Sequence, residues 1–277
     1  MNTSSGMLYI VGTPVGNLED MSFRAIRILK EVDLIAAEDT RHTRVLLDHF
    51  EINTPTESYH KFSEKSKIPK IIENLLSGKN IALVSDAGMP GISDPGELLI
   101  KEAVKNHIYI IPVPGPSALI LALSSSGLST ERFIFEGFLP RKESERMQRL
   151  YALKDETRTA IFYEAGNRIA DTICDMKNIL GNRECVIARE LTKKFEEIKR
   201  GNFDNIMTKI SSTKGEFVIL VGGSQQKDRK EISLKEEIEG LQKQLGISAK
   251  EAIKLTAVKL NLPKREVYSE WIRKNSD

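Results

Sequence analysis

Short apolar runs alternate with amphipathic stretches along the first 125 residues of the chain. The runs at 8–12, 34–37, 81–84 and 109–113 are bounded by polar or turn-forming residues and predict strands, of which 8–12 and 34–37 are expected to be buried. The stretches between them repeat apolar residues at helical spacing and predict helices over 22–32, 40–50, 67–77, 94–106 and 117–125. Strands and helices that alternate in this order predict a largely parallel sheet with helices on both faces.

Two local signals refine this pattern. Asp94 and Pro95 fit the N-cap and first position of a helix, which predicts that the helix ending near 106 begins there. Pro112 interrupts the last apolar run, and proline cannot donate to a sheet ladder. That strand is therefore predicted at an edge or an end of the sheet.

The second half of the chain continues with strands but loses the regular alternation. Strands are predicted over 133–138, 159–164, 184–190, 196–201 and 216–222, and helices over 142–153, 168–180 and 203–212. No helix fits between 190 and 196, so these two strands predict a hairpin and a mixed sheet. After a polar linker, helices are predicted near 233–245, 248–260 and 263–274, the second with a capping box at Ser248 and Glu251.

The length of 277 residues fits two domains better than one, at roughly 150 residues per domain. A Ser/Gly/Thr-rich stretch at 124–132 marks the boundary between them. The sequence thus predicts two α/β domains, over 7–124 and 125–225, with a parallel-rich sheet and then a mixed one. A helical C-terminal extension is predicted over 231–277.

Composition and charge exclude several classes of protein. Hydrophobic residues make up 40% and charged residues 29% of the chain, which is globular, and a net charge of +2 excludes a polycationic tail protein. We find no apolar run near the ~18 residues of a membrane span and no signal peptide, so we expect a cytoplasmic protein. Cys174 and Cys185 are too few for a disulfide framework or a metal site and are predicted to be buried free thiols. From 227 onward the tail has 12 basic and 9 acidic residues, which leaves open a solvated or an RNA-contacting role.

Four loops carry the candidate chemistry, and each follows a predicted strand of the first domain. Ligands of open parallel sheets bind just beyond the carboxyl ends of the strands. The first loop has neither the spacing of a phosphate-binding loop nor that of a dinucleotide-binding loop. The four segments are Gly12–Leu18, Ala37–Thr43, Ser85–Gly96 and Pro112–Ala118.

Each loop has a structural interpretation beside the functional one. Glycines let the backbone approach a ligand, and Asp86 can accept a hydrogen bond from an amine or a hydroxyl. Prolines hold Ser117 at a helix start, although a rigid helix start explains the same pattern. Glu38 and Asp39 can serve a hydroxyl-bearing substrate, or can form a structural ion-pair cluster with Arg41.

Together these motifs resemble the tetrapyrrole-methylase-like class of S-adenosylmethionine methyltransferases, and within it the small-subunit ribosomal RNA 2′-O-methyltransferases. The resemblance spans about residues 8–223, with a looser match at 262–268. Besides the four loops, it is carried by Asp20, Arg24, Gly137–Pro140, Phe162–Glu164, Arg189–Lys193 and Lys214–Glu216. One departure is Asn167, which stands before Arg168 where the resemblance implies a histidine.

The resemblance implies that S-adenosylmethionine binds in a cleft between the two α/β domains. Its implied contacts are Pro14, Asp86, Ala87, Gly88, Met89, Ile92, Ser117, Ala118, Tyr163 and Leu191. The cofactor supplies the reactive methyl group, and the protein supplies positioning and electrostatics. The implied reaction is methyl transfer to the ribose 2′-oxygen of a decoding-centre cytidine in 16S rRNA, on the 30S subunit.

A ribose hydroxyl is a poor nucleophile, so a general base can assist, and the candidates are Glu38, Asp39 and Lys193. RNA phosphates need basic partners, for which the candidates are Arg41, Arg44, Arg141 and Arg168. Relatives of this class imply a homodimer. Two alternatives stay open: a methylase of the same fold acting on a small tetrapyrrole, and a non-catalytic ribosome-assembly factor. Ser85–Gly88 and Glu38–Arg41 favour RNA over a tetrapyrrole, and the intact glycine-rich loops argue against a non-catalytic protein.

Overall fold

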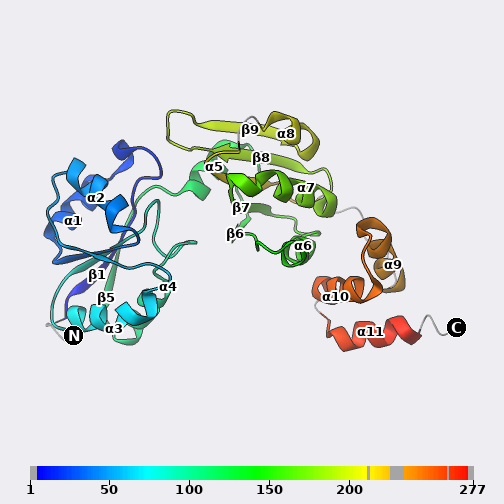
Figure 1. The fold of residues 1–277 in the computed structure, drawn as a ribbon, viewed down its shortest axis with the longest axis horizontal. Helices are drawn as coiled ribbons and strands as arrows, with labels where there is room; N and C mark the ends of the chain where they lie inside the picture. Colours follow the sequence, from blue (N-terminus) through cyan, green and yellow to red (C-terminus); the bar gives the residue numbers. More distant parts are fainter. Residues whose placement is uncertain (1–4, 211–212, 225–233, 261, 274–277) are drawn as a thin grey trace. The chain divides into compact units, whose positions relative to one another are not determined.

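The computed structural model describes residues 5–210, 213–224, 234–260 and 262–273, and these form two compact units. The first unit contains the described residues up to Ala122 together with Glu190–Glu196. The second contains Leu123–Arg189 and the described residues from Glu197 onward. Two α/β sheets and a C-terminal helical region confirm the predicted fold class (Figure 1), while the predicted domain boundaries stay predictions.

The first unit is built on a parallel five-stranded sheet with the order β3-β2-β4-β1-β5. Its strands are β1 (Met7–Val11), β2 (Leu34–Ala37), β3 (Thr56–Ser58), β4 (Ile81–Val84) and β5 (Tyr109–Val113). β5 lies at an edge, as Pro112 predicted. β3 was not predicted, because its three residues are polar and half-buried and give no apolar run.

Helices cover both faces of this sheet, as predicted. They are α1 (Phe23–Glu31), α2 (Thr40–His49), α3 (Glu64–Leu76) and α4 (Glu97–Lys105), with a short η1 (Leu18–Asp20) before α1. After β5 the chain forms α5 (Ala118–Ser126), whose residues are divided between the two units. Strand side chains alternate between the faces. Val11 and Ile35 pack in one core with α1 and α2, whereas Leu8 and Ile10 pack in another with α3 and α4.

The second unit is built on a mixed sheet with the order β6-β7-β10-β8-β9. Its strands are β6 (Phe133–Phe138), β7 (Thr159–Ala165), β8 (Glu184–Arg189), β9 (Glu197–Asn202) and β10 (Glu216–Val221). β6 and β7 are parallel, β8 and β9 form the predicted antiparallel pair, and β10 is antiparallel to both β7 and β8. The helices are α6 (Glu143–Ala152), η2 (Gly166–Arg168), α7 (Ile169–Leu180) and α8 (Phe203–Lys209).

Three C-terminal helices share the core of the second unit. They are α9 (Leu234–Leu245), α10 (Ala249–Leu260) and α11 (Lys264–Arg273). Ile238 and Ile253 are buried in the same cluster as Tyr151 of α6. The Tyr151 hydroxyl donates to Glu237 Oε1 over 2.6 Å, and Lys259 Nζ donates to the same oxygen over 2.6 Å. These helices are therefore packed onto the sheet unit through both apolar and polar contacts.

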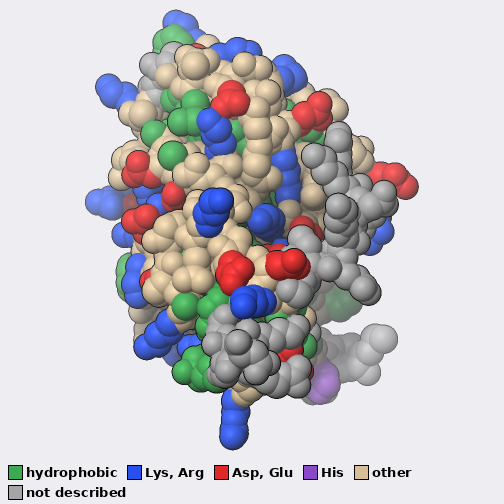
Figure 2. Space-filling model, turned by 90° about the vertical axis from the view of Figure 1, so that its right-hand side faces the viewer, with side chains coloured by type: hydrophobic (Ala, Val, Ile, Leu, Met, Phe, Trp, Pro, Cys, Tyr) green, Lys and Arg blue, Asp and Glu red, His purple; other side chains and the backbone are tan. Residues whose placement is uncertain are grey.

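The helix caps and charges of this region follow the sequence pattern. The predicted capping box is confirmed, since Ser248 N donates to Glu251 Oε2 over 3.1 Å and Glu251 N donates to Ser248 Oγ over 3.3 Å. Figure 2 shows the side of the molecule that carries the C-terminal helices, with basic and acidic side chains interspersed over its described residues. That distribution is typical of a solvated surface.

The two cysteines differ in environment, so the prediction that both are buried is wrong for one of them. Cys174 is exposed on α7, while Cys185 is fully buried in β8. Burial raises the pKa of the Cys185 thiol to about 12, because the thiolate is poorly solvated there.

This difference gives an expected result for thiol titration. A chromogenic disulfide reagent at pH 8 should modify one thiol in the folded protein and two after denaturation. Cys174→Ser should leave no thiol that reacts in the folded protein. Two fast-reacting thiols in the folded wild type would contradict the burial of Cys185.

Candidate active site

The loops after β1 and β4 are joined by backbone pairing. Thr13 N donates to Gly88 O over 2.9 Å, and Gly88 N donates to Thr13 O over 3.0 Å. The buried Thr13 hydroxyl donates to Ser85 O over 3.0 Å. Pro14 directly follows Thr13 in the sequence, so these contacts place it near the Ala87–Gly88 turn. Gly88 has φ +78°, a conformation that favours glycine.

The loops after β1 and β5 also meet, through two glycines. A Cβ atom on Gly12 would lie 2.7 Å from Gly115 Cα, and one on Gly115 would lie 2.6 Å from Gly12 Cα. Met89 belongs to this contact, because its Sδ would lie 2.6 Å from the same Gly12 Cβ atom. Side-chain-free backbone at both positions is therefore what lets these loops pack, just before Ser117 and Ala118 begin α5.

Carboxylates gather at the ends of β2 and β4. Asp39 N donates to Asp86 Oδ1 over 3.1 Å, and Asp86 N donates to Glu38 Oε2 over 3.3 Å. These two bonds cross between adjacent strand ends and hold all three carboxylates at one edge of the sheet. The structure thus brings Glu38, Asp39 and Asp86 together, as their positions after parallel strands predicted.

Asp39 is the most strongly perturbed group of this cluster. Its carboxylate caps α2 by accepting from Arg41 N over 2.8 Å, and it also accepts from Arg41 Nη2 over 2.8 Å. The side-chain hydrogen bond from Arg41, followed by the backbone bond, holds the pKa of Asp39 far below its ordinary value. The same pairing raises the pKa of Arg41. Asp39 is thus a stable anion and a weak base.

The segment Glu190–Glu196 belongs to the first unit and lies against the loop after β1. A Cβ atom on Gly16 would lie 2.9 Å from Leu191 O and 2.3 Å from Lys193 Cγ. Lys193 Nζ donates to Glu190 Oε1 over 3.1 Å. Leu191 is buried, and the backbone of this segment is unusual, with φ +51° at Glu190 and +66° at Thr192. Leu191 and Lys193 therefore join the first unit's loops although they lie far along the sequence.

The remaining predicted residues of the first unit lie around this edge but are more exposed. Ile92 is an exposed residue of the long loop after β4. Arg41 is exposed beside Asp39, and Arg44 Nε lies 2.7 Å from Asp48 Oδ1 on the next turn of α2. Arg44 is thus already paired within its own helix.

Three predicted residues lie in the second unit. Tyr163 on β7 makes edge-to-face contacts with Phe135 and Phe138, at centroid distances of 5.0 and 5.6 Å. Arg168 Nη2 donates to Leu139 O and Pro140 O, over 3.0 Å each, and lies 3.4 Å from the buried Glu164 Oε2. Arg168 therefore holds the turn after β6. Arg141 is exposed, next to that turn.

The start of α4 differs from the prediction. The helix begins at Glu97, with Gly96 as N-cap at φ +138° and no side-chain cap, so the start at Asp94 and Pro95 was wrong. Pro95 O accepts from Gly91 N over 3.1 Å, which folds 91–95 back as a loop. Gly96 N donates to Glu64 Oε1 over 2.9 Å, which replaces a local cap with a contact from α3.

Glu64 organises a buried polar network that sequence reasoning missed. The Tyr59 hydroxyl, fully buried, donates to Glu64 Oε1 over 3.0 Å, so this oxygen accepts from both Tyr59 and Gly96. The only local signal was an aromatic and an acidic residue five positions apart. The network joins the end of β3, the start of α3 and the loop after β4.

Replacing Glu64 with leucine is expected to destabilise the protein. The Tyr59 hydroxyl and the Gly96 amide would both lose their acceptor, and each buried donor left unpaired costs ~1–3 kcal/mol. Urea denaturation should show a free energy of unfolding lower by roughly 2–6 kcal/mol. Tyr59→Phe removes the hydroxyl donor and leaves the Gly96 amide bonded to Glu64, so it should lower the free energy of unfolding by less. Equal midpoints for wild type and Glu64→Leu would contradict the network.

No helix in the described ranges is long and apolar enough to cross a membrane. No group of three or more His, Cys, Asp or Glu side chains in those ranges is placed to hold a metal ion.

The comparisons with known proteins agree with this fold. The family model described as Tetrapyrrole (Corrin/Porphyrin) Methylases matches residues 7–207. A protein of Halalkalibacterium halodurans named ribosomal RNA small subunit methyltransferase I is 48% identical, over 95% of this chain and 94% of its own length. The protein of the same name in Bacillus subtilis is 47% identical, over 96% and 94%.

Among solved structures, uroporphyrin-III C-methyltransferase of Thermus thermophilus, complexed with S-adenosyl homocysteine, has a TM-score of 0.57. It is 17% identical and covers 78% of this chain and 97% of its own, so it shows the fold. The chain belongs to the tetrapyrrole methylase family, and within it to the group named ribosomal RNA small subunit methyltransferase I. The family resemblance stated from the motifs is confirmed.

Proposed function

We propose that the protein transfers the methyl group of S-adenosylmethionine to the ribose 2′-oxygen of a decoding-centre cytidine in 16S rRNA, on the small ribosomal subunit. The observation that carries the proposal is the 47–48% identity, over nearly the whole chain, to proteins named for small-subunit rRNA methylation. The protein's contribution is to orient the two reactants and to shape the local field.

The residues of the first unit fit the cofactor chemically. S-adenosylmethionine presents a sulfonium cation, ribose hydroxyls and an adenine ring, and it supplies an activated methyl group when bound. The Glu38, Asp39 and Asp86 carboxylates favour a cation nearby and can accept from hydroxyls. The basic neighbours Arg41 and Lys193 are each paired with a carboxylate, which limits their repulsion of the sulfonium.

The same contacts divide the roles of the three candidate bases. Asp39 is a weak base because of Arg41, so we assign it the task of accepting hydrogen bonds as a fixed anion. Lys193 donates to Glu190, and that bond would have to break before it could accept a proton. Glu38 is therefore our first candidate for taking the 2′-hydroxyl proton, a role that contributes about 10²- to 10⁴-fold in rate.

The test is methyl transfer from labelled S-adenosylmethionine to purified small subunits, naked 16S rRNA and a uroporphyrinogen. A 2′-O-methyl group protects the adjacent phosphodiester from alkali, so the product can be mapped as one alkali-resistant cytidine. Glu38→Gln should lower the rate of methyl transfer by more than it lowers cofactor affinity, because the amide keeps an acceptor oxygen but cannot take the proton. Label in the tetrapyrrole, and none in RNA, would overturn the proposal.

We also propose a homodimer, as relatives of this class imply. Size exclusion with light scattering should give twice the 31.1 kDa of one chain. A mass of one chain across micromolar concentrations would reject the dimer and leave the proposed reaction standing.

A further inference from the structure

The connection between β3 and α3 exposes an aromatic ring between two lysines. We call residues His60–Lys65 the 60–65 segment. Phe62 is 97% exposed, the largest exposed fraction among the large hydrophobic side chains described. Lys61 and Lys65 are exposed on either side of it along the chain. Single exposed apolar residues are common, so the argument depends on what surrounds this one.

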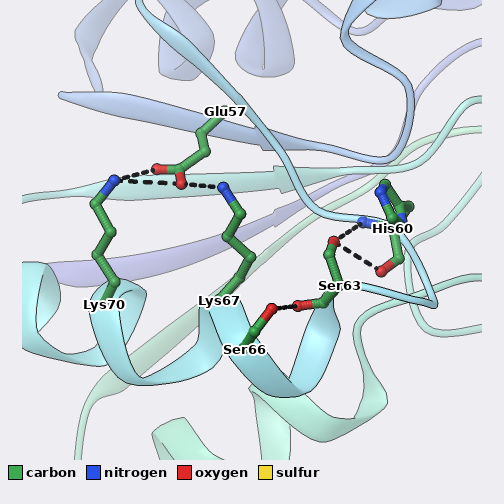
Figure 3. Close-up of polar contacts among 6 residues, drawn as sticks. All are labelled: Glu57, His60, Ser63, Ser66, Lys67 and Lys70. Carbon is green, nitrogen blue, oxygen red and sulfur yellow. Dashed lines mark hydrogen bonds and ion pairs between the residues drawn. The ribbon is translucent and has the colours of Figure 1, made fainter.

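The lysines of the 60–65 segment differ from those that follow on α3 in whether a carboxylate pairs with them. Lys67 Nζ lies 2.6 Å from Glu57 Oε1 and Lys70 Nζ lies 3.2 Å from Glu57 Oε2, and Figure 3 shows both reaching the same carboxylate on β3. The hydrogen bond from Lys67 lowers the pKa of Glu57. Lys61 and Lys65, by contrast, have no ion-pair or hydrogen-bond partner for their side chains among the described residues. Two uncompensated cations therefore lie on either side of Phe62 along the chain.

The backbone of the 60–65 segment is held in place at both ends. His60 N donates to Ser63 Oγ over 3.2 Å, and Ser63 Oγ lies 3.1 Å from His60 O (Figure 3). Tyr59 before the segment and Glu64 within it are buried, and Glu64 accepts from Gly96 at the end of the loop after β4. The segment is therefore ordered before any partner arrives, and it lies at the edge of the sheet that carries Asp86.

We propose that the 60–65 segment is a docking point for single-stranded RNA, with Phe62 stacked on an unpaired base and Lys61 and Lys65 against flanking phosphates. Aromatic side chains that stack on bases and lysines that follow the backbone are the two elements of single-strand recognition. The inference rests on the proposed function, since it places part of the RNA substrate beside the carboxylate edge of the first unit.

A second copy of this chain is the alternative partner for the exposed phenylalanine of the 60–65 segment. A two-fold interface would place identical surfaces against each other. The unpaired charges of Lys61 and Lys65 would then be buried in both copies, which is unfavourable at a dry contact. A polyanion removes that cost, and for this reason we favour RNA.

The test measures binding separately from catalysis. The probes are purified small ribosomal subunits and a fluorescein-labelled single-stranded RNA of twelve mixed-sequence nucleotides. The variants are Phe62→Ala, Phe62→Leu, Phe62→Trp and Lys61→Ala/Lys65→Ala. The controls are Lys70→Ala, which removes a lysine already paired with Glu57, and Tyr109→Ala, which removes an exposed aromatic at the opposite edge of the sheet.

Phe62→Ala and Phe62→Leu should weaken binding of both probes by about tenfold or more, and Phe62→Trp should restore it, because a flat ring stacks and leucine does not. The double lysine variant should reduce the slope of log affinity against log salt by about 1.4, at about 0.7 per phosphate contact. The two controls should bind like wild type, and all variants should keep wild-type affinity for S-adenosylmethionine.

Wild-type RNA binding by Phe62→Ala would overturn the inference, as would Phe62→Leu binding as well as Phe62→Trp. Loss of a dimer in Phe62→Ala, with RNA affinity unchanged, would assign the segment to a second copy instead. Failure of the proposed function is recognised separately. In that case the wild-type protein binds S-adenosylmethionine but methylates no RNA.

Discussion

Replacement of Asp86 with alanine is expected to weaken binding of S-adenosylmethionine strongly while the protein stays folded. The variant removes a negative charge from the carboxylate edge and leaves Asp39 N without its acceptor at 3.1 Å. Truncating one partner of a buried charged contact typically costs about 2–5 kcal/mol, and for the half-buried Asp86 the lower bound corresponds to a roughly 30-fold loss of affinity. Isothermal titration calorimetry measures the loss directly.

Three further variants make this result specific. Asp86→Asn keeps an oxygen that can accept from Asp39 N but removes the charge, so its affinity should fall between those of wild type and Asp86→Ala. Ser117→Trp should block binding by bulk alone. Asp48→Ala removes a carboxylate that pairs with Arg44 on the α2 surface, and it should bind normally. Unchanged affinity in Asp86→Ala and Ser117→Trp would move the cofactor site away from these loops.

Replacement of Gly115 with valine is expected to lower both stability and cofactor affinity. Its Cβ atom would lie 2.6 Å from Gly12 Cα, 2.7 Å from Gly12 C and 2.8 Å from Gly12 O, and backbone atoms cannot rotate away as a side-chain end can. Forcing extra volume into a packed site typically costs about 1–3 kcal/mol. Thermal denaturation should show a lower Tm, and calorimetry should show weaker binding of S-adenosylmethionine.

The matched control is Gly240→Ala on α9. A Cβ atom at Gly240 meets nothing within 4 Å, and alanine favours a helix by roughly 0.5–1 kcal/mol over glycine. This variant should be neutral or more stable. A Gly115→Val protein with wild-type Tm would show that the loops after β1 and β5 can separate without cost.

Apolar runs and turn residues were enough to predict four strands of the first sheet, because β1, β2 and β4 bury contiguous apolar side chains and β5 keeps an apolar run although it is partly exposed. β3 escaped because three half-buried polar residues pair with β2 and carry no apolar signal. The start of α4 was misplaced for a different reason. Asp94 and Pro95 are good local caps, but Glu64 on another helix supplies the contact that fixes Gly96. Propensity was overridden there by a long-range partner.

The candidate site also contains features that the local sequence pattern predicts and features that depend on long-range contacts. That Glu38, Asp39 and Asp86 share an edge follows from parallel strands, and no pairwise contact was needed to predict it. The bond between Thr13 and Gly88 and the approach of Gly12 to Gly115 join loops about 75 to 100 residues apart in the sequence. A local sequence pattern does not show which distant loops meet, so these contacts were not predicted. The roles of Tyr163, Arg141 and Arg168 in binding stay predictions.

The strand order of the second sheet has a consequence for synthesis of the chain. β10 lies between β7 and β8, so those two earlier strands are not neighbours and each depends on β10 for its second pairing partner. A nascent chain that has not yet released Glu216–Val221 from the ribosome exposes the edges of both, and exposed strand edges favour aggregation. Completion of this unit is therefore a late event in translation. A premature stop just before β10 should leave no partly useful sheet, however much of the chain has been made.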